Sequence, residues 1–279
     1  MREYEGLLSN QIQPLNLLAF WQLGREQRIG HRHPLVKLFT WLMGPLGINS
    51  RIRNAHVLHV INRLSLPESI SILDAGCGQA EALFWLAKRH PKWKLVGAEF
   101  DAQRVETNKK IAHAQQLSNL QFRQQSLTDM SDEMIYDVVL SMDVLEHIED
   151  DQGALMRIKA SLKPDGVLIL HLPRQNAEAW RFLPPFRKYT TPDHVRPEYT
   201  TQEIEQLLQN CGFKIIEMRA TYSKLGELAF ELNYLCWQKP TLRAALALLT
   251  YPLAFILAFF EVQKSYSNGN AFIITAVPL

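Results

Sequence analysis

Cysteine is scarce in this 279-residue sequence, and its few cysteines follow no paired pattern. Cys77, Cys211 and Cys236 are an odd number, and none belongs to a C-x-x-C pair. A disulfide framework and a structural zinc site are therefore not supported. The first residues carry acids where a secretory signal has a basic region. We accordingly predict free thiols in a reducing compartment and a cytoplasmic location.

Neither sign of charge is in large excess. The sequence holds 30 Lys and Arg against 28 Asp and Glu, which leaves a formal net charge of +2. A protein that neutralises a phosphate backbone across its whole surface needs a larger excess of cations. We therefore expect no nucleic-acid partner.

A hydrophobic run long enough to cross a bilayer is also missing. Residues 244–260 are 17 residues without a charge, and a spanning helix needs roughly 20. Pro252 stands in the middle of this segment, and proline breaks or kinks a helix. We predict a broken hydrophobic helix here.

Two common nucleotide-binding motifs are absent. No G-x-x-x-x-G-K-[ST] string occurs, so a P-loop is excluded. Gly76 and Gly78 begin a dinucleotide fingerprint, but Glu81 stands where the third glycine is required. Glu99 does supply an acid at the end of the second expected strand. Nicotinamide binding is therefore disfavoured, although a ligand can still approach the main-chain N–H groups of the glycine turn.

Short apolar runs alternate with helical segments from about residue 69 to residue 172. This order is typical of β-α-β units, which build a parallel sheet. Beyond it, Thr200 and Glu203 form a capping-box pattern at a helix start, and Gly212 is placed to end that helix. We predict seven strands, at residues 69–74, 94–99, 120–123, 136–141, 166–172, 213–218 and at the C-terminal residues 271–279.

Four strings stand in the right order at the strand ends for a known family. They are ILDAGCGQA, VGAEFD, YDVVLSMDVLEHIEDD and LKPDGVLILHLP, and HVRPEYTTQEIEQLLQNCGF follows them. Together they resemble the successive motifs of class I S-adenosylmethionine-dependent methyltransferases. The resemblance covers roughly residues 69–220 and is closest to the small-molecule branch that contains the quinone-biosynthesis enzymes.

The resemblance implies a fold class and a division of the chain. The fold is expected to be α/β, with a Rossmann-like, doubly wound, mostly parallel seven-stranded sheet. Residues 1–60 are expected to form a helical N-terminal cap, and residues 61–222 the methyltransferase core. A hydrophobic helical insertion is expected at residues 223–270, before the final strand of the core at residues 271–279.

The same resemblance implies how S-adenosylmethionine is bound at the first two strands. Asp74, Gly76, Cys77 and Gly78 are expected to hold the methionine end, with the Asp74 carboxylate facing the ammonium group. Such a charge-assisted pair is chemically reasonable at a strand end. Glu99 is expected to accept hydrogen bonds from the two ribose hydroxyls.

Five further positions complete the expected cofactor site. Phe100 is expected to pack near the adenine, and Met142 to lie beside the methionine portion. The family usually has an acid after the third strand, but Ser126 and Leu127 occupy that position here. Asp143 either faces the methionine portion or caps the helix that follows it.

Three histidines are candidates for a catalytic base, should the acceptor be a hydroxyl. The first two are His171 at the end of the fifth strand and His194 in the following loop, and His147 is the third choice. Some relatives with an acid-x-x-Glu-His string similar to Asp143–His147 bind a divalent metal there. The same string is common in relatives without a metal, and we predict none.

The regions added to the sheet are expected to select the acceptor. The loop at residues 174–199 interleaves aromatic and basic side chains, which indicates an acceptor with an apolar body and an anionic group, or equally an ordinary solvated loop. We predict methyl transfer to a small, hydrophobic or lipid-linked acceptor. An RNA or protein methyltransferase and a non-catalytic S-adenosylmethionine-binding protein are the alternatives.

Peripheral contact with a membrane is a further expectation. The segment 244–260 is expected to line an apolar acceptor pocket or to rest on a lipid surface, since the final strand must return to the sheet. Residues 37–43 offer a matching apolar stretch, and the alternative is that the two segments pack on each other as a buried cap. The cations that flank this stretch are Arg25, Arg28, Arg32, Arg51 and Arg53.

Overall fold

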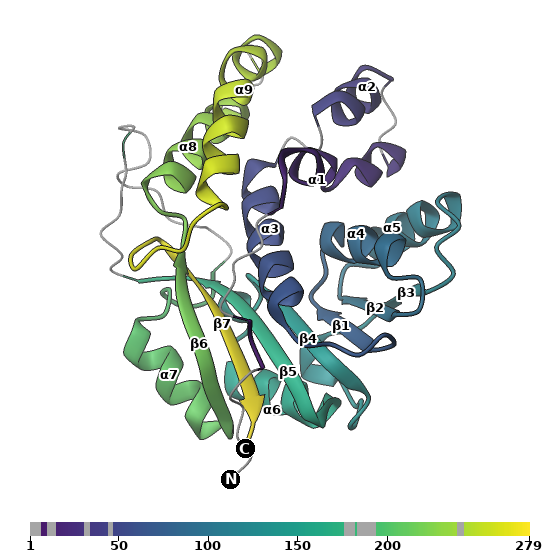
Figure 1. The fold of residues 1–279 in the computed structure, drawn as a ribbon, viewed down its shortest axis with the longest axis vertical. Coiled ribbons are helices and arrows are strands. Elements are labelled where there is room, and N and C mark those ends of the chain that lie inside the picture. The colour runs from purple at the N-terminus through teal and green to yellow at the C-terminus, as the bar shows by residue number, and fades with distance from the viewer. Residues whose placement is uncertain are drawn as a thin grey trace.

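A twisted seven-stranded sheet with helices on both faces forms the body of the protein (Figure 1). The computed structural model describes residues 7–9, 15–30, 34–43, 47–175, 182, 194–238 and 243–279. The strand order is β3-β2-β1-β4-β5-β7-β6. The strands are β1 (Ser71–Ala75), β2 (Lys94–Glu99), β3 (Leu120–Gln124), β4 (Tyr136–Met142), β5 (Leu162–Pro173), β6 (Phe213–Thr221) and β7 (Ala271–Pro278).

Parallel pairing dominates the sheet, as predicted. β1 pairs in parallel with both β2 and β4, and only β7 runs antiparallel to its two neighbours, β5 and β6. The central strands are almost entirely buried, because helices cover both faces of the sheet. The predicted return of the final strand is therefore confirmed, and with it the Rossmann-like fold class.

Helices connect the strands and cover the sheet. Those that follow strands of the core are α4 (Glu81–Arg89), α5 (Ala102–Ala114), α6 (Asp151–Ser161) and α7 (Thr201–Asn210), with short 3₁₀ turns η2 (Leu127–Asp129) and η3 (Leu145–His147). The capping box of Thr200 and Glu203 is present at the start of α7, and Gly212 follows that helix with φ +74°.

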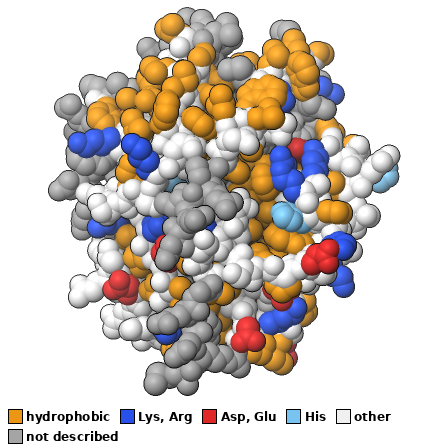
Figure 2. All heavy atoms as spheres, in the orientation of Figure 1, with side chains coloured by type: hydrophobic (Ala, Val, Ile, Leu, Met, Phe, Trp, Pro, Cys, Tyr) orange, Lys and Arg blue, Asp and Glu red, His pale blue; other side chains and the backbone are white. Residues whose placement is uncertain are grey.

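Five helices form a cap at one end of the molecule. They are α1 (Leu17–Gln22), α2 (Pro34–Met43), α3 (Ile48–Arg63), α8 (Lys224–Gln238) and α9 (Arg243–Glu261), with the 3₁₀ turn η1 (Arg25–Gly30) between α1 and α2. Aromatic contacts join these sequence-distant helices. The ring centroids of Phe20 and Phe255 are 5.2 Å apart, and those of Phe39 and Tyr251 are 5.5 Å apart. Figure 2 shows apolar side chains on the outer surface of this end as well.

The prediction of a helix broken at Pro252 is wrong. α9 runs from Arg243 to Glu261 with Pro252 inside it. Proline removes one main-chain hydrogen bond, and packing of neighbouring residues such as Tyr251 and Ala254, both fully buried, holds the helix together across the gap. Among the described residues, no helix is both long and apolar enough to cross a membrane.

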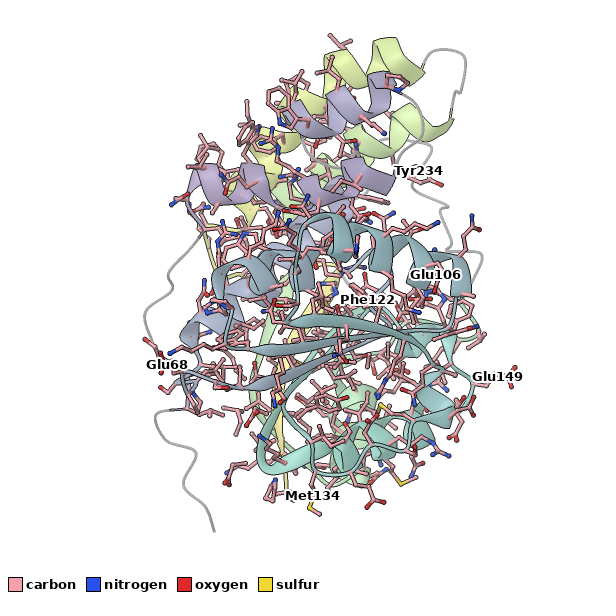
Figure 3. All side chains as sticks on the ribbon, turned by 90° about the vertical axis from the view of Figure 1, so that its right-hand side faces the viewer. Glu68, Glu106, Phe122, Met134, Glu149 and Tyr234 are labelled. Atoms are coloured by element: carbon pink, nitrogen blue, oxygen red, sulfur yellow. The ribbon has the colours of Figure 1, made fainter. Side chains whose placement is uncertain are left out.

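The core lies in two layers, one on each face of the sheet. Figure 3 shows Phe122 in the layer between the sheet and helices α4 and α5, where its ring lies 5.6 Å from that of Phe84. Glu106 and Glu149, by contrast, point outward into solvent. The carboxyl ends of β1, β2 and β4 meet at one edge of this packed body, which is where ligands bind in open α/β sheets.

Candidate active site

A glycine turn connects β1 to α4. Gly76 and Gly78 have φ values of +88° and +52°, a region that favours glycine. The N–H groups of Gly76 and Cys77 both donate to the carbonyl of Ala98, at 2.9 Å. A Cβ on Gly76 would lie 2.6 Å from Val144 Cγ2. The tight turn and the close approach of the chain after β4 therefore both require glycine here.

Gly78 faces open space rather than packed side chains. The nearest atom to a Cβ built on it is Arg104 Nη1, at 3.9 Å. Its N–H donates to Glu99 Oε2 at 2.9 Å, and Asn108 Nδ2 donates to its carbonyl at 2.8 Å. The turn after β1 is thus tied to the acid at the end of β2.

A cavity of about 740 Å³ opens at this edge of the sheet. Nine of the ten residues expected at the cofactor line it, so the fold brings together side chains that follow four different strands. These nine are Gly76, Cys77, Gly78, Glu99, Phe100, Ser126, Leu127, Met142 and Asp143.

Asp74 is the exception, because its side chain is fully buried and does not line the cavity. Neither carboxylate oxygen has a hydrogen-bond partner. Burial raises the pKa of this carboxyl to about 7, although nearby Arg53 lowers it in part. An unpartnered buried acid just before the glycine turn is a site that a cationic group would satisfy.

Asp143 is held in place by an arginine and a histidine. Arg53 Nη1 donates to Asp143 Oδ2 at 2.6 Å, and His171 Nδ1 lies 2.5 Å from Oδ1. Burial alone would raise the pKa of Asp143, but His171 and Arg53 outweigh it and hold the pKa below its usual range. The residue has φ +52°, and Val144, not Asp143, occupies the N-cap of η3. The capping alternative is therefore wrong.

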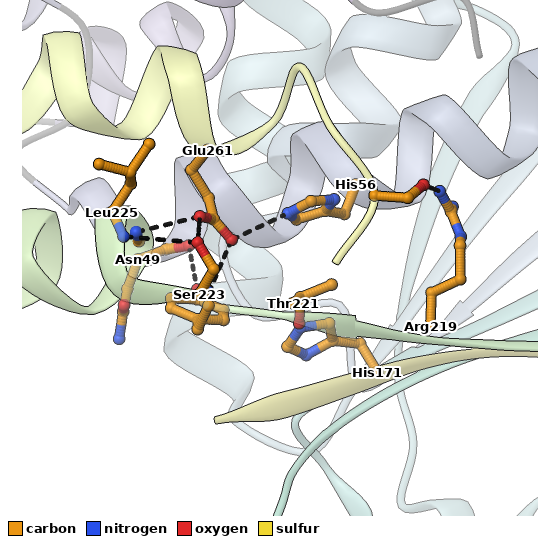
Figure 4. A network of polar contacts seen from close by, with 11 residues as sticks. Asn49, His56, His171, Arg219, Thr221, Ser223, Leu225 and Glu261 are labelled. Carbon is orange, nitrogen blue, oxygen red and sulfur yellow. Dashed lines mark hydrogen bonds and ion pairs between the residues drawn. The ribbon is translucent and has the colours of Figure 1, made fainter. Parts of the chain in front are cut away.

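The structure separates His171 from the other two candidate histidines, His147 and His194. His171 is buried, with its second nitrogen 3.0 Å from Thr221 Oγ1 (Figure 4). Because both of its nitrogens are engaged and it does not line the cavity, it is not placed to take a proton from an acceptor there. His147 is exposed and lines the cavity, and its ring centroid is 5.0 Å from that of His194.

One cluster among the described residues could hold a metal ion. Glu146, His147 and His194 each offer a ligand atom, and these atoms lie within 4.8 Å of one another. Burial, with a smaller contribution from Asp143, raises the pKa of Glu146 to about 8. A metal would have to displace that proton. The expectation that the protein needs no metal stays a prediction.

Several cavity-lining residues were not predicted from the sequence. Gln125 lines the cavity, and its Oε1 is buried without a partner. Arg53 and Asn54 reach the cavity from α3, and Asn54 Nδ2 donates to Glu81 Oε2 at 2.6 Å. The only sequence signal for Gln125 was its place beside Ser126. No motif around Arg53 and Asn54 marked them as site residues. They reach the cavity only because α3 packs beside the strand ends in the folded protein.

Two expectations fall partly outside the described residues. Most of the aromatic and basic loop, at residues 176–181 and 183–193, is not described, and neither is Arg32. Of the remaining flanking cations, Arg51 is fully buried and Arg53 pairs with Asp143. These two arginines are therefore used inside the protein, and they do not add to a cationic outer surface beside residues 37–43.

The glycine turn after β1, the acid at the end of β2 and the cavity that both line are typical of an α/β enzyme that binds a nucleotide-like cofactor at the sheet edge. Residues 50–218 match the family model described as a methyltransferase domain. The chain therefore belongs to this family and is a class I S-adenosylmethionine-dependent methyltransferase. The open face of Gly78 and the unpartnered Asp74 carboxylate fit that cofactor.

A known relative and solved structures are similar to this chain. The ubiquinone biosynthesis O-methyltransferase of Rickettsia typhi is 24% identical over 201 residues, which cover 68% of this chain and 80% of the relative. The structure of the [4+2]-cyclase SpnF is similar with a TM-score of 0.58, 19% identity and coverage of 80% and 81%.

A third similar protein was solved with the demethylated cofactor bound. It is the Haemonchus contortus phospholethanolamine N-methyltransferase 2 in complex with phosphomonomethylethanolamine and S-adenosylhomocysteine, with a TM-score of 0.60 and 16% identity. The likeness covers 89% of this chain and 61% of that one. At such identities the structural likeness shows the shared fold.

Replacing Glu99 with alanine is expected to weaken S-adenosylhomocysteine binding by at least tenfold. Each hydrogen bond to a charged acceptor contributes roughly 1.5 to 3 kcal/mol. Glu99 is expected to accept two such bonds from the ribose hydroxyls. Calorimetric titration measures the change. Glu106→Ala, on the exposed face of α5, is the matched control and should bind like the wild type. Equal affinity of the Glu99 variant and the wild type contradicts the assignment.

Proposed function

We propose that the protein transfers a methyl group from S-adenosylmethionine to a small acceptor with an apolar body. The observation that carries this proposal is the cavity wall after β4. Met142, Val144 and Ile148 line it together with the imidazole of His147. A volume of about 740 Å³ also lies within the range of about 300–1,000 Å³ that is usual for small-molecule sites.

Most of the proposed roles of the cofactor-binding residues follow from their places around the cavity, and that of Asp74 follows from its place just before the glycine turn. Gly76 and Gly78 admit the methionine end of the cofactor, and the buried Asp74 carboxylate supplies the negative charge that favours its ammonium group. Glu99 and Phe100 serve the ribose and the adenine. When bound, S-adenosylmethionine supplies an activated methyl group on its sulfonium. The chain's own work is to orient the acceptor and exclude water.

Asp143, Arg53 and His171 have a positioning role in this proposal. The aspartate has an unfavourable backbone conformation for a non-glycine residue, at φ +52°. Its ion pair with Arg53 and its contact with His171 hold it at the cavity. Because Arg53 belongs to α3, this contact also links the helical cap to the site.

His147 is the proposed base for a hydroxyl acceptor, with His194 beside it. Substitution of His147 by alanine should remove the acid limb of the pH–rate profile, since a histidine base is active only when deprotonated. Initial rates measured across the pH range test this. His113→Ala, on the exposed side of α5, should keep the wild-type profile. If His147→Ala also keeps it, the base lies elsewhere or the acceptor needs none.

The acceptor class can be tested without knowing the acceptor. Purified protein is incubated with methyl-labelled S-adenosylmethionine and a cell extract, and label is counted separately in the lipid, RNA, protein and small polar fractions. Label in the lipid fraction, or in apolar small molecules, is expected. Label in RNA or protein overturns the proposal in favour of a macromolecular substrate. Binding of the cofactor without transfer to any fraction favours a non-catalytic role.

The names of similar proteins agree with a small acceptor. The Rickettsia relative is named for an O-methylation in ubiquinone biosynthesis, and the Haemonchus structure holds a small phosphoamine. Of the two, the apolar wall of this cavity favours the first kind of acceptor. A lipid-like acceptor would be found at a membrane surface, which makes the outer face of the cap relevant.

A further inference from the structure

α9 is apolar on two sides, which is unusual for a helix at the surface. Its inner side packs in the cap, where Tyr251, Ala254 and Ala258 are fully buried. Its outer side carries Leu249, Leu253, Ile256 and Phe260, and each of these is at least half exposed. Packing within this chain explains the first side and leaves the second without a partner among the described residues.

α1 and α2 repeat this arrangement next to α9. Their inner side chains pack on it, through Phe20 with Phe255 and Phe39 with Tyr251. Their outer side chains include Leu17, Leu18, Leu38, Trp41 and Leu42, all 45% or more exposed. The segments therefore bury each other on one side, as the buried-cap alternative expects, and they expose apolar surface on the other side. Contact of that exposed side with a lipid surface stays a prediction.

These exposed side chains lie at the same end of the molecule. Figure 1 places α1, α2 and α9 together above the sheet, and Figure 2 shows apolar side chains gathered across that end with Lys and Arg at its margins. We define the cap surface as the exposed apolar residues of these three helices. Exposed apolar patches of this kind mark a contact site.

The charges of the cap surface are one-sided. α1 and α2 contain no acid, and the single acid of α9, Glu261, is fully buried. Lys37 is exposed on α2. The Arg25 guanidinium lies 3.4 Å from the ring centre of Trp21 and 5.6 Å from that of Trp41. Cations and tryptophans beside aliphatic side chains are the combination that favours the interface of an anionic bilayer.

We propose that the cap surface docks the protein on an anionic lipid bilayer, with α9 and α2 lying in the interface. The proposal rests on the proposed function in one respect, because docking would bring a lipid-like acceptor to the enzyme. A protein partner would have to match the shape of the exposed apolar side chains on α9 and on α1 and α2. A fluid bilayer adapts to any shape, and it therefore suits this surface better. α9 is not both long and apolar enough to cross the membrane, so in this proposal it lies along it.

Flotation with vesicles tests the proposal directly. Wild-type protein is mixed with phosphatidylcholine vesicles that contain or lack phosphatidylglycerol, at low and at high salt. Binding to the anionic vesicles that weakens at high salt is expected. Leu253→Glu and Trp41→Glu should each lower the bound fraction by roughly tenfold, since a charge must then enter the apolar layer. Met156→Glu, half exposed on α6, is the matched control and should bind like the wild type.

Hydrogen exchange of the wild type supplies a second measurement that needs no variant. Peptides of α2 and α9 should gain protection when anionic vesicles are added, whereas peptides of α6 should not. No flotation at low salt overturns the proposal, as does binding that both Glu variants leave unchanged. A dimer that Leu253→Glu separates, without vesicle binding, shows instead that the cap surface joins two copies of the chain.

The same variants separate this proposal from the methyltransferase function. Leu253→Glu and Trp41→Glu should bind S-adenosylhomocysteine with wild-type affinity, because neither residue lines the cavity. Vesicle binding without label in any lipid or apolar fraction would overturn the acceptor and leave docking standing. Transfer to an apolar acceptor without vesicle binding would overturn docking and leave the proposed acceptor standing.

Discussion

Gly78→Leu is expected to lower the affinity for S-adenosylmethionine by more than about a hundredfold. A Cβ on Gly78 meets nothing closer than 3.9 Å, so the leucine side chain would extend into the cavity and fill space that the cofactor needs. Exclusion of the ligand removes the binding energy as a whole, and one hundredfold corresponds to about 2.7 kcal/mol. Calorimetric titration of the purified variant measures this loss.

Steric exclusion must be separated from backbone strain. Gly78 has φ +52°, where any residue with a Cβ costs roughly 1 kcal/mol. Gly78→Ala carries this strain with little added bulk and should therefore bind much more tightly than Gly78→Leu. Gly47→Ala, where a Cβ would make only ordinary contacts, should leave cofactor binding unchanged. Wild-type affinity in Gly78→Leu would remove the glycine turn from the site.

Asp74→Asn is expected to stabilise the cofactor-free protein while weakening cofactor binding. The folded state raises the pKa of Asp74 from 3.8 to about 7 through burial. Below pH 4 the carboxyl is protonated in both states, so it adds no penalty. As pH rises from 4 to 7 the unfolded chain releases the proton that the native state keeps, and the free energy of unfolding falls by up to about 4 kcal/mol. The asparagine variant lacks this loss.

The variant should therefore gain stability over the wild type between pH 4 and 7 and keep that gain above pH 7. Denaturant unfolding at several pH values measures the difference, and Asp129→Asn, at the exposed acid of η2, is the control. Cofactor binding should show the opposite trend. The wild type should bind more tightly as pH rises toward 7 and release a proton on binding below that pH. A variant that binds as tightly as the wild type would show that Asp74 does not serve the ammonium group.

Local sequence signals predicted the sheet and most of the cofactor site, but not the burial of individual side chains. The strands were predicted to within a few residues, because alternating apolar runs and turn residues are local signals. Nine of the expected cofactor positions line one cavity, because each stands at or just after the end of a strand and parallel strands end at a common edge. Asp74 broke the pattern, because burial of a side chain depends on what packs over it.

The three histidines show where local patterns stop being informative. From the sequence, His171 and His194 were the first candidates for the base and His147 the third. The structure exposes His147 in the cavity but buries His171 between Asp143 and Thr221. These partners lie 28 and 50 residues away along the chain, and no spacing rule connects positions so far apart.

The sequence by itself determined the order of strands and helices, the glycine turn, the acid at the end of β2 and the caps of helices such as α7. Each of these depends on residues within a turn or two of one another. Only the tertiary structure decided that Arg53 reaches Asp143, that Arg51 is buried and that α9 continues through Pro252. It also decided which apolar side chains of the cap are covered. Such outcomes depend on which helices meet in space. Both sides of α9 are apolar, so hydrophobicity alone does not tell which side is buried.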